Sequence, residues 1–154
     1  MRLSKGRGLL LVFCLWSLPL LHAQSAGGLA GGHADPVSLG GMTLDELIRR
    51  AGIPRSVYAV RGLEEWQDDV VFVYDQGDFY IYKDRVWQAG LKAARGIKTG
   101  DTRSAVSTLL GSNAEARGDS LLYSLNDGPW PLTLRCDFDR AGKVQAIFIY
   151  RTDF

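Results

Sequence analysis

The segment VVFVYDQGDFYIYKDRVWQA, residues 70–89, decides the fold. Three runs of β-branched and aromatic residues within it, 70–74, 79–82 and 86–89, are typical of strands. The turn-forming residues between these runs are too few for a crossover connection, so neighbouring strands must run antiparallel. The segment therefore predicts an antiparallel meander, and residues 57–61 predict a further short strand before it.

The residues that precede this meander predict a short helix. Thr43 and Glu46 have the spacing of a capping box, in which each side chain bonds the other residue's backbone N–H. Gly52 supplies the stop signal, and the proline two residues later forbids continuation. Between these signals one apolar stripe recurs at helical spacing, formed by Leu44, Leu47, Ile48 and Ala51.

The same order of signals begins again further along the chain. Three pairs of residues are each 59 positions apart: Gly41 and Gly100, Thr43 and Thr102, and Gly52 and Gly111. A second helical stretch is followed by strand-like segments at 121–125, 132–138 and 144–150. The sequence therefore predicts an α+β fold of two tandem repeats, residues 42–96 and 97–154. Each repeat is expected to be a short helix, or a helix hairpin, followed by an antiparallel β-meander.

Residues 1–23 predict a cleavable signal peptide, with cleavage between Ala23 and Gln24. A basic start precedes the apolar run 9–21, which is shorter than the roughly 20 residues that a membrane anchor needs. A lipoprotein alternative would use Cys14, but this cysteine lies inside the apolar run. We therefore expect a periplasmic or secreted protein without a transmembrane anchor after cleavage.

Removal of the leader changes the composition. Loss of Arg2, Lys5 and Arg7 leaves 15 basic residues against 17 acidic ones, a net charge of −2, which does not favour a nucleic-acid partner. Cys136 becomes the last remaining cysteine, so an intrachain disulfide is excluded. Residues 24–41 are rich in Gly, Ala and Ser and predict a flexible tether.

The candidate chemistry argues against an enzyme. The sole histidine left after cleavage, His33, lies in the predicted tether, where neither a catalytic base nor a metal cluster is expected. Cys136 alternates in phase with Leu134 and Phe138, which predicts a buried core thiol. Acidic pairs such as Asp75 and Asp78 flank turns, where aspartate bonds its own backbone. We expect no catalytic site, no metal and no cofactor.

Aromatic residues are the candidates for binding. Alternation along residues 79–82 turns Phe79 and Ile81 to one face and the two tyrosines to the other. Large rings with little entropy to lose dominate protein-binding surfaces, although such rings also cover a core or the seam between repeats. The predicted protein-binding residues are Phe72, Tyr74, Tyr80, Tyr82, Trp87 and Trp130.

The spacing of glycine, threonine and apolar residues in the two units resembles that of a known family. The first unit reads Gly41-Met42-Thr43, then Leu47 and Gly52-Ile53-Pro54; the second reads Gly100-Asp101-Thr102, then Val106 and Gly111, with a strand-rich tail over 134–147. Each resembles the repeat of the SmpA/OmlA family, to which the small lipoprotein of the outer-membrane β-barrel assembly machine belongs. Two units in one exported chain are similar to the β-lactamase inhibitory protein. The chain departs from the lipoprotein pattern because it has no cysteine at the cleavage site.

This resemblance implies a domain that acts by contact with another envelope or secreted protein. We predict an exported, non-enzymatic protein-binding or assembly module of the cell envelope. The alternative is a proteinaceous inhibitor of an extracytoplasmic enzyme, such as a β-lactamase-like hydrolase.

Overall fold

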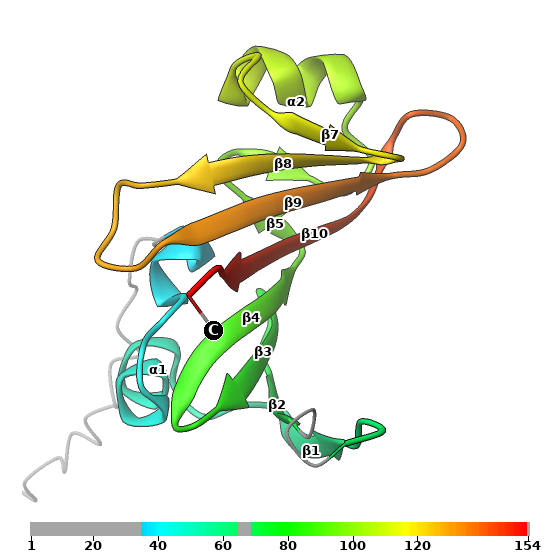
Figure 1. The fold of residues 1–154 in the computed structure, drawn as a ribbon. Coiled ribbons are helices and arrows are strands. Elements are labelled where there is room, and N and C mark those ends of the chain that lie inside the picture. Colours follow the sequence, from blue (N-terminus) through cyan, green and yellow to red (C-terminus); the bar gives the residue numbers. More distant parts are fainter. Residues whose placement is uncertain (1–34, 65–68, 154) are drawn as a thin grey trace, which may run out of the picture. The chain divides into compact units, whose positions relative to one another are not determined.

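The computed structural model describes residues 35–64 and 69–153, in which one antiparallel sheet of eight strands dominates. The strand order is β1-β2-β3-β4-β10-β9-β8-β7 (Figure 1). The strands are β1 (Ser56–Val60), β2 (Asp69–Val73), β3 (Gly77–Tyr82), β4 (Arg85–Leu91), β7 (Glu115–Arg117), β8 (Ser120–Leu125), β9 (Leu132–Phe138) and β10 (Val144–Arg151). The remaining elements are η1 (Pro36–Leu39), α1 (Leu44–Ala51), the β5 (Ala93–Ala94) and β6 (Ile97–Lys98) hairpin, and α2 (Arg103–Leu110).

The predicted fold class is wrong. The protein is mostly antiparallel β with two short helices of eight residues each, and it is not an α+β arrangement of two helix-plus-meander repeats. Eight of the strands form one sheet because β4 pairs with β10, from Gln88 opposite Tyr150 to Leu91 opposite Ile147. A meander that ended at β4 would leave an unpaired edge of backbone N–H and C=O groups, and pairing with β10 satisfies them.

The local signals for both helices are confirmed. The capping box of α1 has both bonds: the Thr43 N–H donates to Glu46 Oε2 over 2.9 Å, and the Glu46 N–H donates to Thr43 Oγ1 over 3.3 Å. At α2 the Ala105 N–H donates to Thr102 Oγ1 over 3.2 Å. The predicted strands of 70–89 are also present as β2, β3 and β4, and they pair antiparallel.

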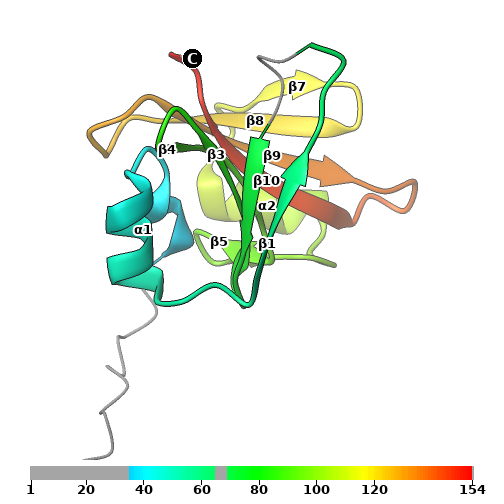
Figure 2. The same ribbon diagram turned by 90° about the horizontal axis from the view of Figure 1, so that it is seen from below.

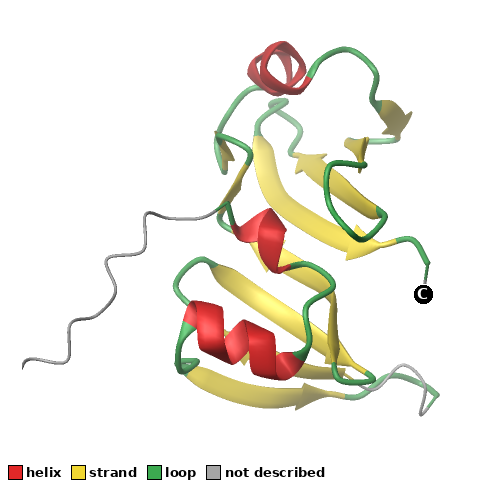
Figure 3. Ribbon diagram, turned by 90° about the vertical axis from the view of Figure 1, so that its left-hand side faces the viewer, coloured by secondary structure: helices red, strands yellow, loops and turns green. Residues whose placement is uncertain are grey.

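The register of the sheet separates two faces. The row through Phe79 includes Phe72, Ala89, Ile149 and Leu134, and it lies on the core face. Leu47 of α1 and Val106 of α2 join this core and are fully buried. Figure 3 shows both helices on the same side of the sheet. The opposite face, called the helix-free face below, carries the row Tyr58, Val71, Tyr80, Gln88, Tyr150 and Thr133.

The described end of the predicted tether is folded. Residues 35–41 include η1, whose Val37 and Leu39 are 3% and 7% exposed and belong to the core. The Asp35 side chain accepts from the Val37 N–H and fixes the start of η1. The prediction of a flexible tether over 24–41 is therefore wrong for its last seven residues, because two apolar side chains suffice to dock this segment. The predicted signal peptide, the Ala23–Gln24 cleavage site and His33 lie outside the described residues.

Candidate protein-binding face

Three of the six predicted binding residues lie on the helix-free face. Tyr80 and Tyr82 alternate with the buried Phe79 and Ile81 along β3, as predicted, and both tyrosines are partly exposed. Trp87 follows the fully buried Val86 on β4 and is also partly exposed. The three side chains therefore belong to one surface.

Trp87 is fixed in place by a hydrogen bond. Its indole N–H donates to Asp69 Oδ1 over 2.9 Å. The register shifts between Tyr80 and Ile81 at this position, because Trp87 of β4 has no partner of its own in β3. Such a bulge changes the direction of the side chains beside it. The ring is therefore held in a defined orientation before any partner binds, which lowers the entropy cost of binding.

Phe72 and Tyr74, also predicted to bind, lie on the core face and not on the helix-free face. Phe72 pairs with Phe79 on the core face and packs against the core. Tyr74 is 4% exposed, and its ring meets Phe79 edge-on with centroids 5.6 Å apart. The Tyr74 hydroxyl donates to the Gly52 carbonyl over 3.2 Å. Tyr74 lies on the same side as Phe72, as alternation requires, and the register of β2 against β3 makes that side the core face.

Trp130 is a packing residue of the loop between β8 and β9. Its indole lies between two guanidinium groups, with Arg85 5.0 Å and Arg151 4.2 Å from the ring centroid. A Cβ on Gly41 would lie 2.2 Å from Trp130 Cδ1, so the ring touches the backbone before α1. The side chain is half-buried against the core and joins three distant segments. These contacts place Trp130 on the helix side, where it packs against other segments, and not on the helix-free face.

Sequence reasoning missed three aromatic residues of the helix-free face. Tyr58 of β1 shares its row with Tyr80, and Tyr150 of β10 belongs to the same row. Phe148 alternates with the buried Ile147 and Ile149 along β10. Burial alternates along residues 147–151, but only the pairing of β10 with β4, which the sequence does not indicate, places Tyr150 in the row of Tyr80.

Burial and nearby groups on this face shift the pKa of Tyr80. Burial raises the pKa of Tyr80, and Tyr58, Asp78 and Asp69 raise it further. The Arg135 guanidinium lies 5.9 Å from the Phe148 ring centroid and bonds Asp137 Oδ1 over 2.6 Å. The helix-free face therefore combines partly exposed rings with charged groups that are already paired.

The side chains of Cys136 and Asp139, whose chemistry could serve catalysis, are buried in the core or hold a turn. Cys136 is fully buried, as predicted, and burial raises the pKa of its thiol to about 11, with a smaller contribution from Asp137. A thiol in this environment is a poor nucleophile. Asp139 accepts from the Ala141 and Lys143 N–H groups and so holds a turn. Within residues 35–64 and 69–153, no group of three or more His, Cys, Asp or Glu side chains is placed to hold a metal ion.

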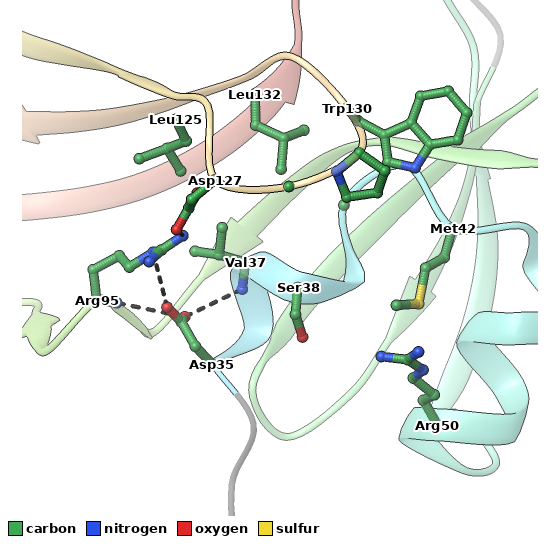
Figure 4. A pocket seen from close by; sticks show the side chains of 13 residues that line it. Asp35, Val37, Ser38, Met42, Arg50, Arg95, Leu125, Asp127, Trp130 and Leu132 are labelled. Atoms are coloured by element: carbon green, nitrogen blue, oxygen red, sulfur yellow. Dashed lines mark hydrogen bonds and ion pairs between the residues drawn. The ribbon is translucent and has the colours of Figure 1, made fainter.

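A pocket of about 420 Å³ lies on the helix side between η1 and the loop after β8 (Figure 4). Arg95 spans one wall, with Nε 3.1 Å from Asp35 Oδ2 and Nη2 2.6 Å from Asp127 Oδ2. The hydrogen bond from Arg95 lowers the pKa of Asp127. Trp130 and Met42 line the other side. The volume would suit a small ligand, but these charged groups are already engaged with one another.

Comparison with known proteins finds similarity in structure alone. No family model and no curated protein matches the chain. An extracellular protein containing a SCP domain from Bacillus anthracis str. Ames matches with a TM-score of 0.52 and 14% identity over 79% of this chain. A DUF4309 family protein (YjgB) from Bacillus subtilis subsp. subtilis str. 168 matches with a TM-score of 0.44 and 14% identity, over 76% of this chain and 91% of that one.

The chain spans about half the length, 47%, of the first of these structures. At this identity the first match shows a shared fold and nothing about activity. Neither match is to the SmpA/OmlA family or to the β-lactamase inhibitory protein, so that resemblance stays a prediction. Among the residues that the structure describes, no helix has both the length and the apolar character needed to cross a bilayer.

Proposed function

We propose that this chain is an exported protein-binding module that contacts another envelope or secreted protein through its helix-free face. One observation carries the proposal: the helices and η1 contribute to the core face, and the opposite face presents partly exposed aromatic rings. These rings belong to Tyr58, Tyr80, Tyr82, Trp87, Phe148 and Tyr150.

The rings are suited to recognition for physical reasons. Tyr and Trp bury large areas on binding and lose few rotatable bonds, and they are enriched among the residues that dominate interface energies. The hydrogen bond from Trp87 to Asp69 holds one ring in advance.

Export is supported by the leader pattern of residues 1–23, with its basic start, apolar run and Ala23 before the cleavage position. The SCP-domain protein with a similar fold is described as extracellular, and this agrees with export of the present chain. A partner in the envelope or outside the cell follows from that location.

Site-specific photocrosslinking in living cells tests the face directly. A photoreactive amino acid at Tyr80 is expected to form a discrete adduct with one partner protein. The matched control places the same group at Leu109 of α2, which is 56% exposed and lies on the helix side. The protein in the Tyr80 adduct, identified by mass spectrometry, distinguishes an assembly component from an inhibited hydrolase.

The adduct at Tyr80 should weaken when Tyr82→Ala and Trp87→Ala are introduced together, because both changes remove contact area from the same face. Equal adducts from Tyr80 and Leu109, or an adduct unaffected by the double substitution, would show that the helix-free face is not the binding surface.

A further inference from the structure

The pocket on the helix side is fixed by contacts within the protein. It lies where η1, the C-terminal end of α1 and the loop between β8 and β9 meet, and Figures 1 and 2 both show these segments at one end of the molecule. Arg95 joins two of them, since its guanidinium pairs with Asp35 before η1 and with Asp127 in the loop. The pocket is therefore formed before any ligand binds, which lowers the cost of binding.

Much of the pocket lining is apolar. Met42, Leu125, Pro129 and Trp130 all line the cavity. The Trp130 ring cannot easily move, because it lies between two guanidinium groups and against the backbone before α1. Burial of apolar surface against these side chains favours a ligand with an apolar body.

The two ends of the pocket differ in charge. At one end the Arg95 guanidinium faces two carboxylates, so this cluster holds one negative charge in excess and repels an anion. At the other end is Arg50, in the last turn of α1. Within residues 35–64 and 69–153, the Arg50 guanidinium forms no ion pair or hydrogen bond.

Arg50 is directed toward the cavity. Figure 4 shows its side chain extending toward Met42 and Ser38. The Ser38 hydroxyl is exposed and likewise has no hydrogen-bond partner among the residues that the structure describes. One cationic group and one hydroxyl, neither engaged with the rest of this part of the chain, therefore stand at the end of the pocket opposite Arg95.

We propose that this pocket binds a small organic carboxylate whose body is apolar. The carboxylate lies at Arg50, because a guanidinium offers a carboxylate two parallel N–H donors, and the Ser38 hydroxyl donates a further bond. The apolar body packs against Met42 and Trp130. The volume of about 420 Å³ is in the range of small-molecule sites.

Titration of the purified protein with naphthaleneacetate, followed by nuclear magnetic resonance, tests the site. The Trp130 indole N–H is the reporter, and loss of its signal in Trp130→Phe identifies it. This signal is expected to shift with a Kd of about a millimolar or less. Naphthaleneacetamide keeps the rings without the charge and is expected to bind about tenfold more weakly. Acetate has the charge without the rings and is expected to give no shift at the same concentration.

Two neighbouring arginines provide matched variants. Arg50→Gln removes the charge at the pocket and is expected to weaken naphthaleneacetate binding about tenfold, with little effect on the amide. Arg49→Gln is the control, because Arg49 is exposed in the same helical turn, pairs with Asp45 over 2.6 Å and does not line the pocket. Both substitutions remove a cation from the C-terminal turn of α1, so an effect through helix stability is common to both.

Equal binding of the acid and the amide overturns the proposal, as do equal losses of binding from Arg50→Gln and Arg49→Gln. The absence of any shift of the Trp130 signal at about 10 mM naphthaleneacetate overturns it as well. The double variant Tyr82→Ala and Trp87→Ala is expected to bind naphthaleneacetate like wild type, and loss of binding there would move the probe to the helix-free face. The pocket is thus tested independently of the function proposed for that face.

Discussion

Neighbouring residues of β3 show how different the two faces of the sheet are. Phe79 is fully buried among core side chains on the helix side, and Tyr80, the next residue, is partly exposed on the helix-free face. The backbone of the strand is common to both residues, so the difference arises from what each face packs against. The core face is covered by α1, α2 and η1, and its residues stabilise the fold. The helix-free face can carry recognition through its partly exposed rings, and Val71 and Thr133 in the same row are buried.

The largest contrast is expected between Phe79→Ala and Tyr80→Ala. Removing a fully buried phenylalanine costs about 3–5 kcal/mol through lost burial and the cavity left behind. Tyr80→Ala removes a partly exposed ring and is expected to cost roughly 1 kcal/mol. Urea denaturation of the two purified variants measures both values. Similar losses for the two substitutions would mean that the helix-free face is a second core and not a binding surface.

A second test concerns the helix side of the molecule at Gly41. This residue has φ +79, and an added Cβ would lie 2.2 Å from Trp130 Cδ1. Gly41→Ala therefore combines backbone strain with a clash against a held ring, and is expected to cost about 2–4 kcal/mol. Gly100 before α2 has φ +91 with open space around it, so Gly100→Ala isolates the strain alone, about 1–2 kcal/mol. Equal thermal shifts for the two variants would show that Trp130 is not fixed.

The sequence predicted those features that depend on residues close together in the chain. The Thr43 capping box, the stop at Gly52 and the three strands of 70–89 are all local features, and the structure contains them. The sequence did not predict that β4 pairs with β10, because nothing in residues 88–91 indicates that they pair with residues 147–150. Strand pairing across such a separation is decided by the packing of the whole core. The same limit explains why two repeats were expected and one sheet was found.

The candidate binding face was predicted in part for a related reason. Alternation placed Tyr80 and Tyr82 correctly, since a regular strand fixes side-chain direction. The side of Phe72 and Tyr74 depends on the register of β2 against β3, which alternation within one strand does not give. Trp130 looked like an exposed loop ring, but Arg85, Arg151 and the Gly41 backbone enclose it, and these contacts come from segments far apart in the sequence.

A third test uses pH and the core-face residue Cys136. Its thiol pKa rises from 9.0 to about 11 in the folded protein because the side chain is buried. Below pH 9 both states hold the proton, and no pH dependence arises from this group. As pH rises from about 9 to 11 the unfolded thiol ionises first, so folding stability falls by roughly 2 kcal/mol. Urea denaturation of wild type and Cys136→Ala across this range measures the difference, which should shrink as pH rises. A constant difference would contradict the burial of the thiol.

The smallest expected effect is on the helix-free face, at the hydrogen bond between Trp87 and Asp69. Trp87→Phe keeps most of the ring and removes the N–H that donates to Asp69 Oδ1 over 2.9 Å. Because the bond is partly exposed, its loss is expected to cost about 1 kcal/mol of folding stability. A double-mutant cycle with Asp69→Ala isolates the pair, and a coupling of roughly 0.5–1.5 kcal/mol is expected. Partner crosslinking from Tyr80 should fall more than stability does, since an unfixed indole must be ordered when the partner binds. If Trp87→Phe reduces folding stability and leaves crosslinking at the wild-type level, the bond serves the fold alone, and this ring behaves like those of the core face.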